Sequence, residues 1–190
     1  MMKEARASAF LAQKRLGKSN PVRVMFMDEG RFGRMDFPRR CWAPVGIRPT
    51  VTAQMVRQYL YGYIAVCPLD GSMASLVLPE VNAESMSVFL NEVSLCYPTE
   101  HVVMIMDQAG WHKAKSLVVP ENITLFWLPP YSPELNPVEH LWDEIREKWF
   151  HNRAFASLDT VQDQLVCALR HLLSNPELVK SITCFDWIES

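Results

Sequence analysis

Apolar and β-prone runs, separated by turn residues, predict five short strands in this chain. The predicted strands span residues 22–27, 59–67, 75–78, 101–106 and 123–128. The first, fourth and fifth are apolar at all but one position each, which is typical of strands buried on both faces of a sheet. An Asp-Gly turn separates the second from the third and predicts a hairpin, so Asp70 is interpreted as a turn residue.

Apolar residues at helical spacing predict helices between and after these strands. Asn82 can cap the first helix, which ends before Pro98. A short helix fits between the last two strands. Asn136 can cap a third helix, with Pro137 in its first turn, and Ser157 can cap a fourth. The order strand, hairpin, helix, strand, helix, strand, helix, helix predicts an α/β fold, a mixed sheet flanked by helices, which is also the element order of a ribonuclease H-like domain.

The length of 190 residues predicts one domain with a small appendage. We expect residues 1–20 to form an N-terminal helix or linker, 21–175 the folded domain, and 176–190 a C-terminal tail that packs on the domain. Residues 31–50 are rich in Gly, Pro and Arg and have no clear period, which predicts a long loop or an irregular hairpin. Loops of this length inside compact domains are usually functional.

Composition narrows the class of protein. Apolar residues make up 49% of the chain, which suits a folded protein and not a disordered one. No apolar run approaches the roughly 20 residues that cross a bilayer, and the charged N-terminal sequence lacks a secretory signal, so we expect a cytoplasmic protein without a membrane span. The five cysteines are widely spaced and never paired as CxxC, which fits neither a disulfide framework nor a zinc site.

Charge is distributed unevenly along the chain. The net charge of −2 counts against a dedicated nucleic-acid binder, which is more often basic. Between Arg31 and Arg57, however, six arginines face one acid, a local balance of +5. From Glu134 to the end, ten acids face five bases, a balance of −5. Such unevenness is often only a solvated surface, so charge alone leaves DNA contact as one of two interpretations.

Two aspartates follow predicted buried strands and are candidate metal ligands. If the strands that precede Asp28 and Asp107 are neighbours, their ends bring the two carboxylates together. In phosphodiester cleavage, two metal ions about 3.5 to 4 Å apart activate the nucleophile and stabilise the leaving oxygen, and Mg²⁺ prefers oxygen ligands. Periodicity does not choose between Asp28 and Glu29, because both faces of the first strand are apolar. Each aspartate also suits a turn or a helix cap.

Glu139 is the third candidate carboxylate. It lies three residues after Asn136, so it also suits the acidic position of a helix-capping arrangement. Four prolines stiffen the segment before it, and a metal ligand needs such a rigid support. Asp143 and Glu144, one turn further on, are fallback candidates. His112 follows the second aspartate, although a lone histidine is more often a surface or helix-start residue than a ligand.

Four motifs carry a resemblance to a known family. They are Met27-Asp-Glu-Gly-Arg-Phe-Gly, Trp42-Ala-Pro-Val-Gly, Met106-Asp-Gln-Ala-Gly-Trp-His and Leu128-Pro-Pro-Tyr-Ser-Pro-Glu-Leu-Asn-Pro-Val-Glu-His-Leu-Trp. Together they resemble the catalytic domain of mariner-superfamily transposases, specifically the bacterial insertion sequence 630 group of DDE endonucleases. The match runs from about Val22 to the last predicted helix, and the final motif is the most distinctive.

The resemblance implies that residues 21–175 form a ribonuclease H-like DDE catalytic domain. It implies a triad of Asp28, Asp107 and Glu139 that binds two Mg²⁺ or Mn²⁺ ions. It further implies cleavage at transposon ends and strand transfer by the freed 3′ hydroxyl into target DNA. The segment between the first two strands then contacts DNA or a partner subunit in a homodimer. The candidate contact residues are Arg31, Arg34, Arg39, Arg40, Trp42 and His112.

The family's helix-turn-helix domains have no counterpart in the roughly 20 residues before the first strand. We therefore expect specific recognition of transposon ends to reside on a separate chain or a missing segment. Two other functions stay open at this point. One is a truncated, non-catalytic transposase fragment that regulates a full-length partner, and the other is a cellular ribonuclease H-like nuclease. The intact set of three acids favours the enzyme, whereas the missing recognition domain and the mild net acidity favour the regulatory fragment.

Overall fold

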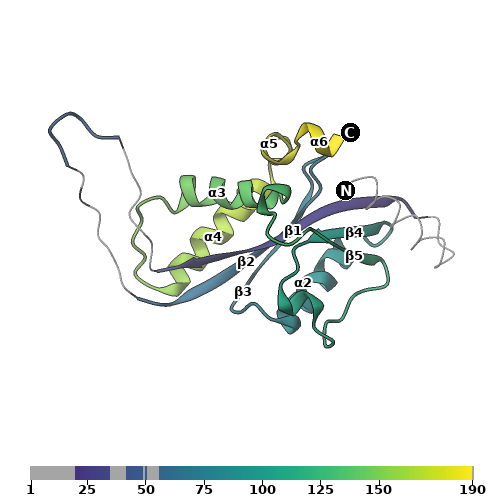
Figure 1. Cartoon of the computed structure of the whole chain (residues 1–190). Helices are drawn as coiled ribbons and strands as arrows, with labels where there is room; N and C mark the ends of the chain where they lie inside the picture. The colour runs from purple at the N-terminus through teal and green to yellow at the C-terminus, as the bar shows by residue number, and fades with distance from the viewer. Residues whose placement is uncertain (1–19, 35–41, 49, 51–55, 190) are drawn as a thin grey trace.

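A five-stranded mixed sheet forms the centre of the molecule (Figure 1). The computed structural model describes residues 20–34, 42–48, 50 and 56–189. The strands are β1 (Val22–Gly33), β2 (Tyr59–Val66), β3 (Met73–Leu78), β4 (His101–Met106) and β5 (Ile123–Trp127). Their order in the sheet is β3-β2-β1-β4-β5, with β1 antiparallel to β2 and parallel to β4. The predicted hairpin is β2 and β3, which pair antiparallel.

Helices cover both faces of this sheet. On one face lies α2 (Ala83–Cys96), and on the other lie α3 (Val138–Trp149) and α4 (Leu158–Leu173) (Figure 1). Two short helices, α5 (Pro176–Thr183) and α6 (Asp186–Glu189), follow and pack beside α3 and α4 through the buried side chains of Val179 and Ile188. The 3-10 helices η1 (Gly110–Lys113) and η2 (Pro133–Leu135) complete the fold. The predicted mixed sheet flanked by helices is confirmed.

The central strands are apolar on both faces because each face has its own core. Val24 and Phe26 of β1 pack in the core beneath α3 and α4, whereas Met25 and Met27 pack in the core beneath α2. All six residues of β4 are buried. This arrangement explains the continuous apolar runs, because alternate side chains of a strand point to opposite faces.

The first strand is longer than predicted. It continues past Asp28 to Gly33, because β2 pairs with it from Phe26 to Gly33. In contrast, β4 pairs with β1 only from Val22 to Phe26. Asp28 therefore lies within the strand, just beyond the point where the β1–β4 pairing ends, and the predicted loop begins later than expected.

Helix ends agree with the sequence at two places and differ at two. The Asn82 side chain accepts from Ser85 N at 2.8 Å, and Ser157 forms a capping box with Thr160 at the start of α4. Between β4 and β5, the expected helix is only the 3-10 turn η1. The α3 cap position is Pro137, one residue later than predicted, although the Asn136 side chain does accept from Val138 N, the first residue of α3, at 3.3 Å. The helix or linker expected in residues 1–20 lies outside the described residues, except for Asn20.

Among the described residues, no helix is long and apolar enough to cross a membrane.

Candidate active site

Asp28 and Asp107 occupy matching positions on neighbouring parallel strands. Phe26 pairs with Ile105, and each aspartate follows its paired residue by two positions. Residues two apart on a strand point to the same face. The two carboxylates therefore leave the same face of the sheet, where β1 and β4 part. The expectation that neighbouring strands bring them together is confirmed.

Glu139 reaches the same place from the first turn of α3. It lines a pocket of about 510 Å³ together with both aspartates. The other residues of the lining come from the end of β4 and from the proline-rich segment before α3; they are Gln108, Ala109, Leu128, Pro129, Pro130, Tyr131, Ser132, Pro133 and Asn136. Three carboxylates from β1, β4 and α3 thus face one pocket, which we call the carboxylate pocket.

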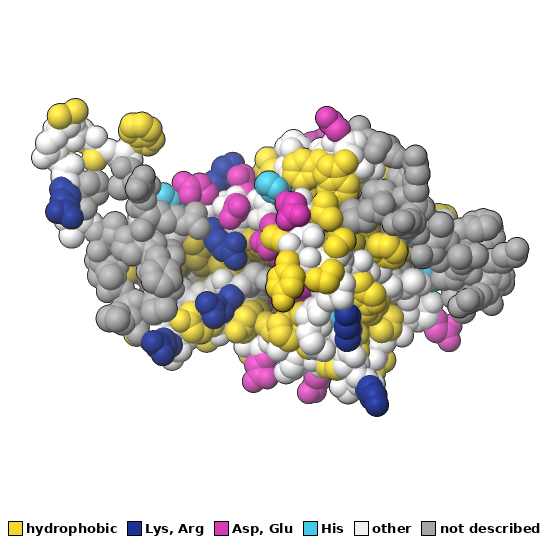
Figure 2. Space-filling view, in the orientation of Figure 1, with side chains coloured by type: hydrophobic (Ala, Val, Ile, Leu, Met, Phe, Trp, Pro, Cys, Tyr) yellow, Lys and Arg dark blue, Asp and Glu magenta, His cyan; other side chains and the backbone are white. Residues whose placement is uncertain are grey.

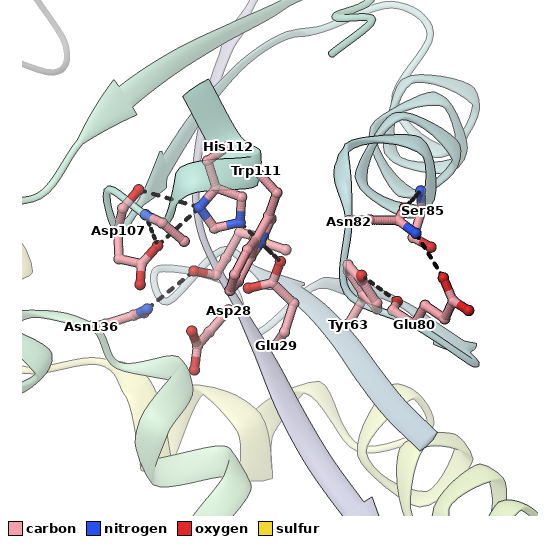
Figure 3. Close-up of polar contacts among 12 residues, drawn as sticks. Asp28, Glu29, Tyr63, Glu80, Asn82, Ser85, Asp107, Trp111, His112 and Asn136 are labelled. Atoms are coloured by element: carbon pink, nitrogen blue, oxygen red, sulfur yellow. Dashed lines mark hydrogen bonds and ion pairs between the residues drawn. The ribbon is translucent and has the colours of Figure 1, made fainter. Parts of the chain in front are cut away.

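The structure separates the roles of Asp28 and Glu29, which periodicity could not. Trp142 of α3 donates its indole N–H to Asp28 Oδ2 at 3.0 Å, so Asp28 faces α3 and the carboxylate pocket. Glu29 points to the opposite face of β1, as Figure 3 shows. There its Oε1 accepts from Trp111 Nε1 at 3.1 Å and lies 2.8 Å from His112 Nε2.

The electrostatics of Asp28 favour a bound proton or a cation. Burial is the main cause that raises the pKa of Asp28 to about 8, and the negative charges of Glu139 and Glu29 add to it. The hydrogen bond from Trp142 opposes this rise without cancelling it. A carboxyl group in this position is therefore neutral at pH 7 unless positive charge enters the pocket.

The carboxylate of Asp107 is held by His112 and by a backbone N–H. Its Oδ1 accepts from Ala109 N at 2.9 Å and lies 2.9 Å from His112 Nδ1 (Figure 3). The hydrogen bond from His112 lowers the pKa of Asp107. Burial lowers the pKa of His112, but hydrogen bonds and charge from Asp107 and Glu29 outweigh burial and raise it to about 9. The protonated imidazole of His112 therefore bridges the carboxylates of Asp107 and Glu29.

The bridge changes the interpretation of His112. Its side chain is 1% exposed, and both ring nitrogens already face carboxylates of the same chain, the buried Glu29 and the more exposed Asp107. The expected contact with DNA or a partner subunit is therefore replaced by an internal one. This internal bridge could not be predicted from the sequence, because its partner Glu29 lies 83 positions away from His112.

The remaining contact candidates lie on or near the extension of β1. Arg31 lies over the ring of Tyr59, 4.8 Å from its centroid, and its side chain is exposed. Arg34 donates to Phe155 O at 3.0 Å and to Gln58 Oε1, so part of its role is to hold the structure. Trp42 is fully exposed. Arg39 and Arg40 lie outside the described residues.

Two hydrogen bonds to backbone carbonyls anchor the proline-rich segment next to both aspartates. At its start, Leu128 N donates to the carbonyl of Met106, the residue before Asp107. At its end, Asn136 Nδ2 donates to the carbonyl of Met27, the residue before Asp28, at 3.0 Å. Sequence reasoning treated Asn136 only as a helix cap and missed this tie, because the two partners are 109 residues apart.

The donor set of the pocket fits a hard divalent cation. The three acidic groups are carboxylates, the ligands that Mg²⁺ and Mn²⁺ prefer, and the described residues of the lining include no cysteine. Burial, together with the negative charges of Glu139 and Glu29, raises the pKa of Asp28, and a bound cation would offset both effects. Within the described part of the chain, no three His, Cys, Asp or Glu residues are gathered closely enough to hold an ion already. The three carboxylates therefore line one pocket, but they are not already arranged as a metal-binding cluster.

Two sequence comparisons match the part of the chain that forms this site. Residues 23–162 match the protein family described as DDE superfamily endonuclease. An uncharacterized protein of Sinorhizobium fredii (strain NBRC 101917 / NGR234), y4pE/y4sA, is 43% identical over 130 residues, which make up 68% of this chain and 95% of that protein. The matched region contains every element that contributes to the carboxylate pocket.

Solved structures of Mos1 transposase are similar in fold. Its paired-end complex with the left transposon end has a TM-score of 0.57 at 18% identity, over 97% of this chain and 62% of that chain. The Mos1 mariner paired-end complex with Mn has a TM-score of 0.58 at 18% identity, over 97% and 63%. The predicted ribonuclease H-like fold is therefore confirmed. This chain spans less than two thirds of the length of those transposase chains.

Proposed function

Because this chain belongs to the DDE superfamily of endonucleases, we propose that it is the catalytic domain of a DNA transposase. In this proposal the domain cleaves DNA at transposon ends and transfers the freed strand into target DNA. The motifs around the three acids further favour the insertion sequence 630 group. The observation that carries the proposal is the convergence of Asp28, Asp107 and Glu139 on one pocket.

In the proposed mechanism, the three carboxylates hold two Mg²⁺ or Mn²⁺ ions. When bound, the ions supply a nucleophile that is reactive at neutral pH and positive charge at the leaving oxygen. The chain's own residues fix the ligands: Trp142 orients Asp28 and His112 orients Asp107. Glu139 is supported by a helix whose start is tied to β1 through Asn136.

The reaction is a pair of phosphoryl transfers. In cleavage, a water oxygen bonds to phosphorus, the bond from phosphorus to the 3′ oxygen breaks, and that oxygen leaves as a 3′ hydroxyl after taking a proton. In strand transfer, this 3′ hydroxyl bonds to a phosphorus of the target strand, and the target's own 3′ oxygen leaves. The same pocket serves both steps, because both displace an oxygen at phosphorus.

The segment between β1 and β2 is the part of the chain that we propose to contact DNA or a second copy of the chain. Its described part, residues 42–48, projects away from the sheet and helices (Figure 1). Trp42, Val45 and Ile47 are exposed there, and Figure 2 shows hydrophobic side chains at this tip. The turn is closed by Ile47 N donating to Pro44 O at 3.0 Å. An exposed apolar tip of this kind marks an interaction site.

A homodimer formed through this tip is part of the proposal, with transposon-end recognition assigned to a helix-turn-helix segment or chain. Trp42→Ser is expected to weaken self-association, measured by sedimentation, while leaving thermal unfolding unchanged because the side chain is fully exposed. Unaltered association of this variant would remove the tip from the dimer interface.

Plasmid nicking tests the activity itself. Purified protein with Mg²⁺ or Mn²⁺ is expected to nick supercoiled DNA, and Asp107→Asn is expected to abolish nicking while leaving the fold intact. Asp143→Asn is the matched control, because Asp143 lies on α3 with a side chain that is 75% exposed and lies outside the carboxylate pocket. Equal nicking by the Asp107 variant would show that the activity comes from another site or a contaminant.

A further inference from the structure

Tyr131 is a fully exposed aromatic residue at the edge of the carboxylate pocket. It has a relative exposure of 101% and lines the pocket with the three acids. Packing in the core therefore does not explain an aromatic residue at this position. The pocket combines a carboxylate floor with an exposed ring at its mouth.

The backbone of Tyr131 is strained. Its φ of 58° lies in the left-handed region, where a bulky residue other than glycine is an outlier. Residues kept in such conformations cluster at ligand-binding sites, where the surrounding structure holds them. Pro129, Pro130 and Pro133 restrict the segment around Tyr131, and the hydrogen bonds of Leu128 and Asn136 anchor its two ends.

The anchoring fixes Tyr131 relative to the reacting groups. One end of the segment is bonded to the residue before Asp107, and the other end to the residue before Asp28. The ring is thus presented from a stiff bridge across the pocket, with little conformational freedom for the backbone to lose when a ligand binds.

We propose that Tyr131 is a stacking platform for an unpaired base of the DNA strand whose phosphate enters the carboxylate pocket. This inference rests on the proposed nuclease function and adds a nucleobase site to it. A phosphate that reaches the carboxylates brings the attached bases to the pocket mouth. Aromatic side chains stack on any base, because every base has a π-face, so the site takes a nucleobase without regard to its identity.

The test uses a fluorescent base. A forked DNA oligonucleotide carries 2-aminopurine at an unpaired position next to the fork junction. The emission of 2-aminopurine falls when the base stacks. The protein carries Asp107→Asn so that the strand is not cut, and Mn²⁺ is present. Tyr131→Ala is compared with Tyr131→Phe and with Leu95→Ala, which removes an exposed apolar side chain on α2, across the sheet from the pocket.

The protein with Tyr131 is expected to quench the 2-aminopurine signal, and Tyr131→Phe and Leu95→Ala to keep the quenching. Tyr131→Ala is expected to lose the quenching and roughly tenfold in affinity for the forked DNA, the scale of one lost base–aromatic stack. Equal quenching and affinity in Tyr131→Ala would overturn the inference, as would the absence of quenching by the protein that retains Tyr131.

A glycine variant separates stacking from a structural role. Tyr131→Gly relieves the left-handed strain, so its midpoint of thermal unfolding is expected to stay the same or rise while quenching is lost. A marked loss of thermal stability with retained quenching would make the residue structural and overturn the inference. Failure of the proposed function is recognised separately: the chain with native Asp107 would then not nick plasmid DNA with either metal, whatever the quenching shows.

Discussion

Replacement of Asp28 by asparagine is expected to stabilise the metal-free protein while removing its function. The carboxyl group is buried beside Glu139, and its pKa rises from an ordinary 3.8 to about 8 in the folded protein. The asparagine side chain has a similar shape and keeps an oxygen that can accept from Trp142 Nε1. The substitution therefore removes the charge and retains the hydrogen bond.

The sign and size of this effect follow from proton linkage. Because the folded pKa lies above the unfolded one, the folded state holds the proton more tightly between pH 3.8 and 8, and stability falls as pH rises through that window. Each pKa unit corresponds to about 1.4 kcal/mol. The asparagine variant lacks this loss, so its advantage in free energy of unfolding should be about 2 kcal/mol at pH 5.5 and about 5 kcal/mol at pH 8.

Urea unfolding in EDTA at these two pH values measures the advantage, with Asp143→Asn as the control that should show no such growth with pH. Added Mn²⁺ should then narrow the gap, because only the native protein binds it well; a metal concentration of 100 times its Kd contributes about 3 kcal/mol. A gap that is absent, or that does not grow between pH 5.5 and 8, would refute the electrostatic reasoning.

Two further predictions concern the surroundings of the site. His112→Phe leaves the buried Glu29 carboxylate without its cationic partner, so we expect a loss of about 3 kcal/mol in the free energy of unfolding at pH 6, measured in urea. Because the folded pKa of His112 is raised to about 9, its stabilisation is complete below about pH 6.5 and fades through pH 9, and a difference independent of pH would contradict the bridge. A Cβ at Gly30 would lie 2.7 Å from the buried Trp142 ring, so Gly30→Ala should cost about 2 kcal/mol and reduce nicking. Gly110→Ala, which meets nothing within 4 Å, is the control, and equal stability of the two variants would show that the ring can move aside at no cost.

The sequence predicted those features that depend on local pattern. The six residues of β4 were predicted with their observed bounds, because an uninterrupted apolar run ending at an acid has few other interpretations. The Asn82 and Ser157 caps are likewise local. The end of β1 was predicted too early, because the Gly- and Arg-containing residues after Asp28 become a strand only by pairing with β2, which is 26 positions away at the Gly33–Tyr59 pair and 34 at the Glu29–Tyr63 pair.

The site was predicted as far as its residue types allowed. The choice between Asp28 and Glu29 could not be made, because it depends on Trp142 on one face and on His112 on the other, 114 and 83 positions away. The helix-cap interpretation of Glu139 was equally open from the sequence. In the structure the Asn136 side chain accepts from Val138 N at 3.3 Å and Glu139 lies in the first turn of α3, so a capped helix start and the position of Glu139 at the pocket occur together.

The proline-rich segment has a consequence for how the sequence of this domain can change over time. Its ends are held through main-chain carbonyls next to Asp28 and Asp107, whereas Tyr131 and Glu134 between them are exposed. Under the proposed function, substitutions at the exposed positions can alter which DNA the pocket mouth accepts without shifting the carboxylates. The segment would then uncouple the chemistry from the choice of substrate, and a lineage could explore new target preferences there while keeping one unchanging set of acids.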